Sequence, residues 1–329
     1  MKDIKRISIF GAGSWGTTLA LLLAENGYDV ILWVREKTKA ELIVKERENK
    51  QYLPGIKMPN NVDVKSSIEE ATTKADLIIN SVPAQFTREV AKKYSKYINC
   101  DIVVNTAKGI ELKTYKRMSE VLKEELPENV SIATLSGPNH AEEVSRKMPT
   151  ATVIASENVS CLNNIKKIFQ TNYFRVFPHD DIIGVEVCGA LKNIAAISTG
   201  VCDGLGYGDN ARASIITLGL MEMSIFGKFL GAKRSTFYGL AGVGDLVATC
   251  TSKLSRNRLV GEYIAEGKSI QDIKKSMHGM IAEGVQTTDA VFESSKKNKL
   301  HMPLTKELYE VLHKGKNLKE SISDLLKIE

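Results

Sequence analysis

A lysine stands alone among apolar residues in the second half of the 329-residue chain. Lys192 is the only charged residue between Val187 and Val201, a stretch that is apolar nearly all the way round a helix. A helix without a polar face is normally buried on most sides, and burial removes water from an ammonium group and lowers its pKa. Lys192 is therefore a candidate acid or base near neutral pH. The alternative is a side chain that runs along the helix surface to solvent.

Three further segments carry groups that could act on the same ligand. Lys108 follows a predicted strand at 102–106, at the carboxyl end where ligands of open α/β sheets bind, and a second lysine would depress the pKa of the first. Asp245 follows a glycine-rich run that implies a close approach of the backbone. The sequence Ser-Arg-Asn-Arg at 255–258, at a predicted helix start, offers a guanidinium, an amide and free N–H groups to a phosphate. The alternative for this last segment is a capped surface helix.

The start of the chain carries a glycine pattern typical of phosphate binding. Gly11, Gly13 and Gly16 follow a predicted strand at 6–10 and open an apolar-patterned helix that stops at Gly27. In that context the glycines permit a tight turn, a close approach of the backbone to a pyrophosphate, and close packing of helix on strand. The helix N-terminus adds unpaired N–H groups. We expect a dinucleotide site here, and the alternative is a plain glycine turn.

The residues after the second predicted strand, at 30–34, bear on the choice of cofactor. Arg35 can pair with the 2′-phosphate of NADP and stack on its adenine. Glu36 could instead hold the ribose 2′-hydroxyl of NAD. The sequence therefore allows NADP or NAD and favours NADP.

Strand and helix patterns alternate along the first half of the chain. Between residues 4 and 178, short β-branched runs alternate with helix-patterned segments, as in a mostly parallel sheet covered by helices. Several of the runs are apolar at consecutive positions, as strands buried on both faces require. The predicted strands are 6–10, 30–34, 77–82, 102–106, 132–135, 152–155 and 174–177. The fold class is α/β, with a Rossmann-type N-terminal domain.

The pattern changes to helix alone after about residue 180. The longest predicted helices are 182–201, 211–230, 257–266 and 304–312. We expect a dinucleotide-binding domain at 1–180 and an all-α, substrate-binding and catalytic domain at 181–329. Pro178 is expected to end the last strand, and an aspartate just after it can cap the first long helix.

Composition restricts the partners. Lys and Arg total 45 against 39 Asp and Glu, a net charge of +6 without a basic stripe, so we expect no nucleic-acid partner. The longest strongly apolar run, 19–24, is far shorter than the roughly 20 residues that cross a bilayer, so we expect no membrane insertion. The five cysteines are widely spaced, the five histidines lie far apart, and the N-terminus lacks a secretory pattern. We expect a cytoplasmic protein with reduced thiols and no metal.

These residues together resemble the bacterial type of NAD(P)-dependent glycerol-3-phosphate dehydrogenase over the whole chain. Lys192 in its Gly-Ala-Leu-Lys-Asn setting and the run from Gly239 to Cys250, joined to Ser-Arg-Asn-Arg, are jointly specific, whereas the glycine turn alone is not. The motifs that carry the resemblance are Gly11-Ala12-Gly13-Ser14-Trp15-Gly16, Ala107-Lys108-Gly109, Ser136-Gly137-Pro138, Gly189-Ala190-Leu191-Lys192-Asn193, the Gly239 run, Ser255-Arg256-Asn257-Arg258 and Glu283-Gly284.

The resemblance implies reversible reduction of a small phosphorylated ketone, dihydroxyacetone phosphate, to sn-glycerol 3-phosphate, the precursor of glycerophospholipids. Lys192 is then the group that donates and accepts the proton. The implied substrate positions are Lys108, Gly137, Asn139, Lys192, Asp245, Ser255, Arg256 and Asn257. The implied cofactor positions are Gly11, Gly13, Ser14, Trp15, Gly16, Arg35, Lys108, Ala141, Arg256, Ile281 and Glu283. At 139 the chain departs from the family, since Asn-His replaces the commoner Ser or Thr followed by Phe.

Other readings compete with this one. A 3-hydroxyacid dehydrogenase or a ketopantoate reductase also has two domains with a helical second half, and acts on carboxylate substrates. A sugar-nucleotide oxidase would need a catalytic cysteine, whereas Cys188 and Cys202 are expected to be packing residues. An alternative from a different class of protein is a regulatory module that binds a nicotinamide cofactor without catalysing a reaction. The apolar helices of the second half also lead us to expect a homodimer.

Overall fold

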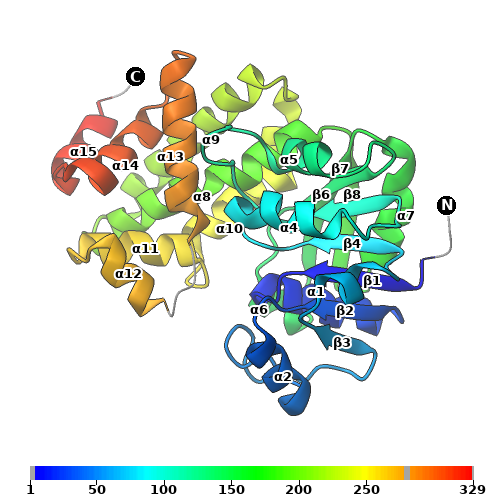
Figure 1. Ribbon diagram of the computed structural model, residues 1–329. Helices are drawn as coiled ribbons and strands as arrows, with labels where there is room; N and C mark the ends of the chain where they lie inside the picture. Colours follow the sequence, from blue (N-terminus) through cyan, green and yellow to red (C-terminus); the bar gives the residue numbers. More distant parts are fainter. Residues whose placement is uncertain (1–3, 278–281, 328–329) are drawn as a thin grey trace. The chain divides into compact units, whose positions relative to one another are not determined.

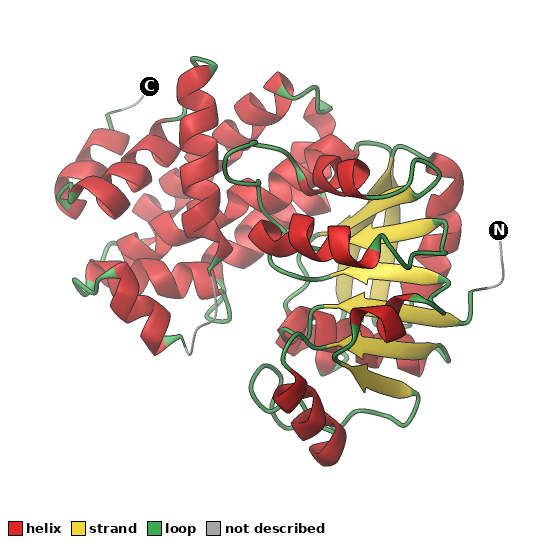
Figure 2. Cartoon of the chain, viewed as in Figure 1, coloured by secondary structure: helices red, strands yellow, loops and turns green. Residues whose placement is uncertain are grey.

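Short runs of β-branched and apolar residues form one sheet in the first half of the chain (Figure 2). The computed structural model describes residues 4–277 and 282–327, and its eight strands lie in the order β3-β2-β1-β4-β5-β6-β7-β8. They are β1 (Arg6–Phe10), β2 (Asp29–Trp33), β3 (Val62–Lys65), β4 (Leu77–Asn80), β5 (Ile102–Asn105), β6 (Ser131–Ser136), β7 (Thr150–Ser156) and β8 (Phe174–His179). Only the β6–β7 pair among them is antiparallel, so the predicted Rossmann-type, mostly parallel sheet is confirmed.

Helices cover both faces of the sheet because successive side chains of a strand point to opposite sides. In β1, Ile9 packs in a cluster with Leu19 of the helix that follows β1, whereas the next residue, Phe10, packs in another cluster with Tyr94 of a later helix. Figure 1 shows α1, α6 and α7 on one face and α4 and α5 on the other. The helices that accompany the sheet are α1 (Ser14–Glu25), α2 (Lys37–Glu46), α3 (Ile68–Thr72), α4 (Thr87–Tyr94), α5 (Met118–Glu125), α6 (Ala141–Ser145) and α7 (Val159–Phe169).

The two edge strands differ from the sequence prediction. Strand β3 is not predicted, because it is short and its Asp63 is exposed, so that it lacks the continuous apolar run of the central strands. At the other edge, β8 continues through Pro178 to His179, so the prediction that Pro178 ends the last strand is wrong. Strand β8 pairs only with β7, and a proline is tolerated on an edge strand because its missing N–H can face the unpaired side.

The chain forms two units. Residues 1–107 and 118–182 make the first, and residues 108–117 and 183–329 make the second. Apart from the 108–117 segment, the described part of the second unit consists of helices and their connections, and each predicted long helix is present with its ends within three residues of the predicted ones. Its helices are α8 (Ile182–Gly204), α9 (Asp209–Phe229), α10 (Asp245–Thr251), α11 (Arg256–Ala265), α12 (Ile270–Ser276), α13 (Glu283–Lys297), α14 (Pro303–Lys314) and α15 (Leu318–Leu325).

Helix α8 is the core helix of the second unit. It is long and apolar enough to cross a bilayer, yet 94% of its most apolar stretch is buried inside the protein, as in the core helix of a soluble protein. Small residues let its neighbours approach closely, since a Cβ atom on Gly219 of α9 would lie 2.7 Å from the Cβ of Ala195. The only charged side chain near the middle of this helix is that of Lys192.

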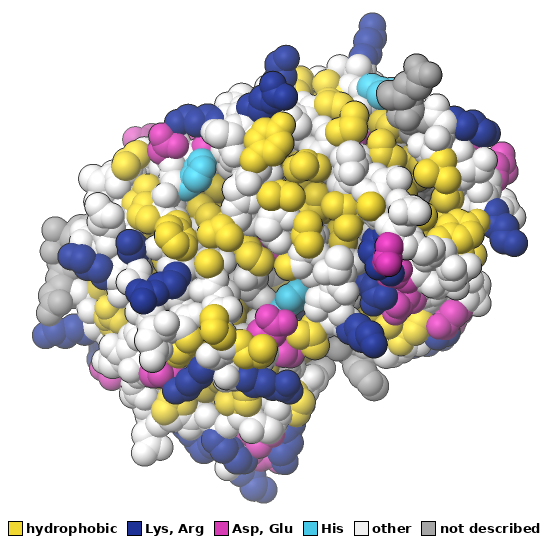
Figure 3. Space-filling model, turned by 180° about the vertical axis from the view of Figure 1, so that it is seen from behind, with side chains coloured by type: hydrophobic (Ala, Val, Ile, Leu, Met, Phe, Trp, Pro, Cys, Tyr) yellow, Lys and Arg dark blue, Asp and Glu magenta, His cyan; other side chains and the backbone are white. Residues whose placement is uncertain are grey.

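Charged side chains are otherwise spread over the surface. On the face shown in Figure 3, Lys and Arg side chains are dispersed and separated by acidic and uncharged ones. Several exposed cations have acidic neighbours, such as Lys93 with Glu89 and Lys147 with Glu25. Exposed pairs of this kind contribute little to stability. These surface pairs therefore do not by themselves mark a site.

Candidate active site

Lys192 lies inside the second unit, with 6% of its surface exposed. Its Nζ atom contacts Oδ1 of Asp245 and donates a hydrogen bond to Oγ1 of Thr249 at 2.8 Å. The predicted burial of this lysine is confirmed, and the alternative of a side chain that reaches solvent is wrong. A buried ammonium needs such oxygen partners because it has lost its water.

Asp245 is shared between two lysines. It is the first residue of α10, is 2% exposed, and places its second oxygen, Oδ2, 2.9 Å from Nζ of Lys108. Thr249 follows one helical turn later, and its hydroxyl donates to Oδ1 of Asp245 at 3.2 Å. The carboxylate of Asp245 thus connects the 108–117 segment with α8 inside the second unit. The sequence analysis predicts that Lys108 and Lys192 act on the same ligand, and this shared contact brings the two lysines together.

Burial disfavours the charged forms of both Lys192 and Asp245, and their neighbours decide the outcome. Burial lowers the pKa of Lys192, repulsion from Lys108 lowers it further, and the attraction of Asp245 only partly opposes this. Burial alone would raise the pKa of Asp245, but the two ammonium groups outweigh it and hold that pKa below its usual value. An ammonium with a lowered pKa beside a carboxylate that stays ionised can lose and regain a proton near neutral pH.

The glycine-rich run before Asp245 lets the chain fold on itself. Residues Leu240–Gly244 form a single wide helical turn that leads directly into α10. A Cβ atom on Gly242 would lie 2.1 Å from the carbonyl oxygen of Phe237, so no larger residue fits there. The predicted close approach is therefore one of backbone to backbone, and it fixes the start of α10 and with it the Asp245 carboxylate.

The Ser-Arg-Asn-Arg segment forms the start of α11. Ser255 caps this helix, since its Oγ accepts a hydrogen bond from the backbone N–H of Arg258 at 3.2 Å. The side chain of Arg256 is exposed at the first helical position. Free N–H groups of the first turn and a guanidinium at the same end suit an anionic ligand.

The first turn of α11 lies beside the part of α8 that carries Lys192. Oδ1 of Asn257 accepts a hydrogen bond from the backbone N–H of Gly284 at 3.0 Å. A Cβ atom on Gly284 would lie 2.6 Å from that oxygen and 2.9 Å from the carbonyl oxygen of Asn193, the residue after Lys192. Glu283, the first residue of α13, directly precedes this contact. The predicted cofactor position Ile281 lies outside the described residues.

The glycine turn of the first unit has the geometry that a pyrophosphate needs. Gly11 has φ +111° and is so close to the chain that a Cβ atom would lie 2.5 Å from the carbonyl oxygen of Ser81. A Cβ atom on Gly16 would lie 1.9 Å from the carbonyl oxygen of Gly11, whereas one on Gly13 would meet nothing within 4 Å. The turn is therefore closed toward the sheet and open at Gly13, where the predicted dinucleotide would approach.

The start of α1 follows this turn and offers N–H groups to the same ligand. Ser14 and Trp15 are the first two residues of the helix, and the N–H of Thr17 makes the first helical hydrogen bond, to the carbonyl of Gly13 at 2.9 Å. The backbone N–H groups before Thr17 therefore have no partner within the helix. They are suited to an anion, so the residues present fit a dinucleotide cofactor.

Arg35 lies two residues after the end of β2, in the position predicted to distinguish NADP from NAD. Its side chain is 70% exposed and lies 3.8 Å from the carboxylate of Glu36. Its guanidinium lies 5.9 Å from the centre of the Phe86 ring. An exposed guanidinium with so loose an acidic partner is free to take a phosphate.

The other predicted positions of the first unit follow β6. Gly137 has φ +153°, and the Nδ2 atom of Asn139 donates to Oγ1 of Thr152 at 3.2 Å. Ala141 begins α6, and its carbonyl accepts a hydrogen bond from the hydroxyl of Thr18 at 3.2 Å. This bond ties the segment after β6 to α1, the helix of the glycine turn.

Two family models match the chain. The model described as the NAD-dependent glycerol-3-phosphate dehydrogenase N-terminus matches residues 6–162, and its C-terminal counterpart matches residues 181–323. The chain belongs to the NAD-dependent glycerol-3-phosphate dehydrogenase family. The resemblance drawn from the sequence motifs is thereby confirmed, and with it the enzyme class, an oxidoreductase that uses NAD or NADP.

Relatives of this family agree over the full chain. Glycerol-3-phosphate dehydrogenase (NAD(P)+) of Chlorobium limicola is 48% identical over 323 residues, 97% of each chain. The crystal structure of glycerol-3-phosphate dehydrogenase from Coxiella burnetii matches with a TM-score of 0.95 at 37% identity and covers 99% of both chains. A ketopantoate reductase from Ralstonia eutropha has a TM-score of 0.62 at 17% identity, which reflects a shared fold alone.

Two residues that support the candidate site of this glycerol-3-phosphate dehydrogenase family member are assigned no role from the sequence, although Thr249 follows the glycine-rich run that carries Asp245. Thr249 could be found from its spacing, since it lies four residues after Asp245 and hence on the same side of a helix. Asn49 carries no such signal. Its buried Nδ2 donates to the carbonyl of Ala12 at 2.9 Å and to the hydroxyl of Thr17 at 2.8 Å, and so holds the glycine turn from a distant segment.

Proposed function

We propose that this protein reduces dihydroxyacetone phosphate reversibly to sn-glycerol 3-phosphate with NAD(P)H, and that Lys192 transfers the proton. The observation that carries the proposal is the buried Lys192–Asp245–Lys108 cluster in a chain of the glycerol-3-phosphate dehydrogenase family. A module that only bound a nicotinamide cofactor would have no use for two lysines around one buried carboxylate, which is costly to assemble.

The proposed reaction divides the work among residues of the second unit. The bound nicotinamide supplies the hydride that C2 of the ketone receives. Lys192, as an ammonium, donates a proton to the oxygen on which negative charge develops, and in the oxidative direction the neutral amine takes it back. Asp245 and Thr249 orient the Nζ atom, and Asp245 balances part of the positive charge.

The start of α11 is proposed to hold the substrate phosphate. Arg256 supplies a guanidinium, and the capped first turn supplies N–H groups. The side chain of Asn257 helps to hold α11 against α13, next to Asn193. Fixing the phosphate at this point would hold C2 near Lys192, which speeds proton transfer by removing the cost of orientation.

The relatives of this chain are named as NAD(P)+ enzymes, and we infer a preference for NADP in this protein. The support is Arg35, whose exposed guanidinium follows β2. Glu36 lies next to it and is the residue through which NAD would be held if the preference were reversed. The proposed setting is the cytosol, with the product entering glycerophospholipid synthesis. Five buried, free cysteines are compatible with a reducing compartment.

We also infer a homodimer. Helix α9 carries a single charged residue between Arg212 and Lys228, the buried Glu222, while Met221 and Phe229 are 48% and 45% exposed. An exposed helix side without charges can pack against a second copy with no repulsion. Light scattering after gel filtration measures the mass, and a monomer at micromolar concentration would contradict the inference.

The decisive experiment is a comparison of substrates. The protein is mixed with NADH or NADPH and with dihydroxyacetone phosphate, 2-ketopantoate or a short 3-oxoacid, and loss of absorbance at 340 nm is followed. We expect turnover with dihydroxyacetone phosphate. Turnover with the carboxylate substrates alone would indicate a different dehydrogenase, and cofactor binding without any turnover would indicate a regulatory module.

The variant Lys192→Met tests the assigned role. Methionine fills a similar volume without a proton to give, so cofactor binding measured by fluorescence titration should stay near that of the unchanged protein. Turnover should fall by roughly 10²–10⁴-fold, the usual contribution of a positioned acid or base. Near-normal turnover would remove Lys192 from the proton-transfer step.

A further inference from the structure

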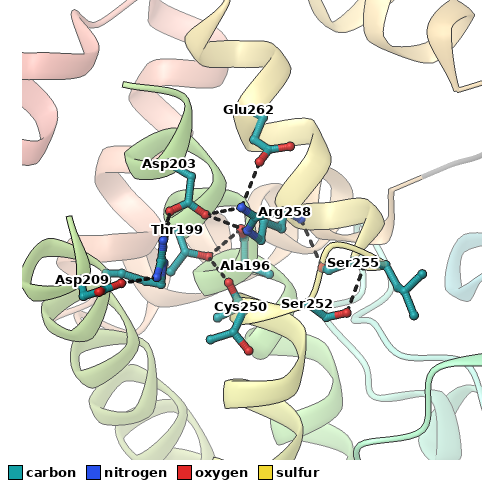
Figure 4. A network of polar contacts seen from close by, with 12 residues as sticks. Ala196, Thr199, Asp203, Asp209, Cys250, Ser252, Ser255, Arg258 and Glu262 are labelled. Atoms are coloured by element: carbon teal, nitrogen blue, oxygen red, sulfur yellow. Dashed lines mark hydrogen bonds and ion pairs between the residues drawn. The ribbon is translucent and has the colours of Figure 1, made fainter. Parts of the chain in front are cut away.

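Asp203, near the end of α8, is a buried carboxylate held between two arginine side chains (Figure 4). Its side chain is 7% exposed, and its Oδ2 atom accepts a hydrogen bond from Nε of Arg258 at 2.7 Å and lies 2.7 Å from Nη2 of the same residue. Its Oδ1 atom accepts from Nε and Nη2 of Arg212 at 3.1 and 2.5 Å. Charge-assisted bonds of this kind are strong and directional, so the carboxylate fixes both guanidinium groups.

Arg258 belongs to the Ser-Arg-Asn-Arg segment that begins α11. Its backbone N–H donates the hydrogen bond that Oγ of Ser255 accepts at the helix cap. Its side chain extends away from the cap to Asp203 and to Glu262, whose Oε1 atom lies 3.0 Å from Nη2 of Arg258. The side chain is 13% exposed, so these carboxylates rather than water surround most of its guanidinium group. Arg258 therefore links the first turn of α11 to the end of α8.

The two helices touch through their backbones at this level. A Cβ atom on Gly200 of α8 would lie 1.9 Å from the carbonyl oxygen of Arg258, and one on Gly261 of α11 would lie 2.0 Å from the carbonyl oxygen of Ile197. Contact between smooth backbones holds the helices close but offers few interlocking side chains to stop one from sliding along the other. The Asp203–Arg258 pair adds a directional contact between the two helices at this level.

The same helix carries Lys192, eleven residues before Asp203. At 3.6 residues per turn this is close to three turns, so the two side chains leave α8 on the same side, roughly 16 Å apart along its axis. We propose that Asp203 is a positioning residue of the reaction: through Arg258 it sets the start of α11 at the distance from Lys192 that the phosphate-bearing substrate spans. This rests on the proposed function, in which the start of α11 holds the phosphate.

The variant Asp203→Asn tests this proposal because it keeps the shape of the side chain and removes its charge. We expect KM for dihydroxyacetone phosphate to rise at least about tenfold. With dihydroxyacetone, the same ketone without phosphate, kcat/KM should stay within about twofold of the unchanged protein, because that substrate does not use the start of α11. A loss of general structural integrity would instead lower both activities together.

The chain offers a matched control in the same network. Asp209 also pairs with Arg212, at 2.5 Å, but its side chain is 92% exposed, and Figure 4 draws its contact to Arg212 and none to Arg258. Asp209→Asn should leave both kcat/KM values unchanged. Arg258→Lys is the second variant, because it keeps the positive charge and loses the two-pronged contact with Asp203. It should reproduce the split between the two substrates if Asp203→Asn does not fold.

The outcomes distinguish a failure of the proposed function from a failure of the positioning role of Asp203. If the unchanged protein does not reduce dihydroxyacetone phosphate, the proposed function is wrong and this inference falls with it. If it does, and the folded Asp203 and Arg258 variants lose both substrates equally or lose neither, the function stands and the positioning role of Asp203 is refuted. Selective loss of the phosphorylated substrate in either variant, with Asp209→Asn unaffected, supports it.

Discussion

Nζ of Lys192 donates a hydrogen bond to Oγ1 of Thr249 at 2.8 Å, and the same hydroxyl donates onward to the carboxylate of Asp245 at 3.2 Å. Both oxygen atoms come from one turn of α10, so the direction of the ammonium group is set by that helix. Lys108 holds the other carboxylate oxygen from a separate segment of the chain. The charge on Lys192 is therefore sensitive to a change at Lys108, although the two lysines lie 84 residues apart in the sequence.

Replacing Lys108 by methionine should move the pH profile of the reduction. Reduction needs protonated Lys192, so kcat falls as the pH rises through its pKa, which burial and the nearby Lys108 both lower. Lys108→Met removes the repulsion and raises the pKa of Lys192, so the alkaline limb should move to higher pH. Lys108→Arg keeps the charge and should leave the limb in place. A limb that stays fixed in Lys108→Met, or moves to lower pH, would contradict this coupling.

Replacing Arg35 by alanine should change the choice of cofactor. The guanidinium is exposed and has only loose contacts with Glu36 and the Phe86 ring, so its removal should cost little fold stability. The KM for NADPH should rise by about tenfold or more, as expected for the loss of a charge-assisted contact to a phosphate, while the KM for NADH should change little. The ratio of the two KM values in one preparation is the measurement. An equal change for both cofactors would show that Arg35 does not read the 2′-phosphate.

The sequence predicts the parts of this molecule that depend on short-range patterns. The GxGxxG turn, the apolar strands and the isolated Lys192 each carry their signal within a few residues, and the structure agrees with all three. Contacts between distant segments leave no such signal. The assignment of residues 108–117 to the second unit, and the contact of Lys108 with Asp245, depend on tertiary packing.

The glycines also show that the sequence does not reveal which distant segments come into contact. The sequence reveals that the backbone comes close to something at Gly242, but not that the neighbour is the carbonyl of Phe237 rather than a ligand. Asp203 likewise looks like an ordinary helix charge, and nothing in the sequence pairs it with Arg258, because the two residues meet only when α8 and α11 pack together. The relative positions of side chains along one helix can be predicted from the sequence, whereas the packing of one helix against another cannot.

Replacing Glu222 by glutamine should remove a pH dependence of stability. Glu222 in α9 is buried and accepts hydrogen bonds from the N–H of Leu304 at 2.5 Å and the hydroxyl of Thr305 at 2.6 Å, at the start of α14. Burial raises its pKa to about 7, although these bonds oppose the shift. The folded state then binds more protons than the unfolded state between about pH 4.5 and 7, so stability falls as the pH rises through that window.

The midpoint of urea unfolding, measured from pH 4.5 to 8, checks this prediction. The unchanged protein should lose up to about 3 kcal/mol relative to Glu222→Gln across the window, since each pKa unit corresponds to about 1.4 kcal/mol. Asp209→Asn, on the same helix but with an exposed carboxylate, is the control and should follow the unchanged protein. Parallel curves for Glu222→Gln and the unchanged protein would mean that Glu222 does not titrate in this range.

Replacing Gly200 by alanine should both destabilise the second unit and weaken substrate binding. The added Cβ atom would lie 1.9 Å from the carbonyl oxygen of Arg258, and because that atom is backbone the two helices must move apart. Overpacking of this kind costs about 1–3 kcal/mol. It also displaces the start of α11, so the KM for dihydroxyacetone phosphate should rise along with the loss of stability.

Gly208→Ala is the matched change for Gly200→Ala. A Cβ atom on Gly208 would meet nothing within 4 Å, and its φ of −82° suits any residue, so stability and KM should both stay close to those of the unchanged protein. The midpoint of thermal unfolding and the KM are measured for both variants. If Gly200→Ala matches Gly208→Ala in both quantities, the close contact of α8 with α11 does not constrain the site, and the positioning of α11 must come from elsewhere in the second unit.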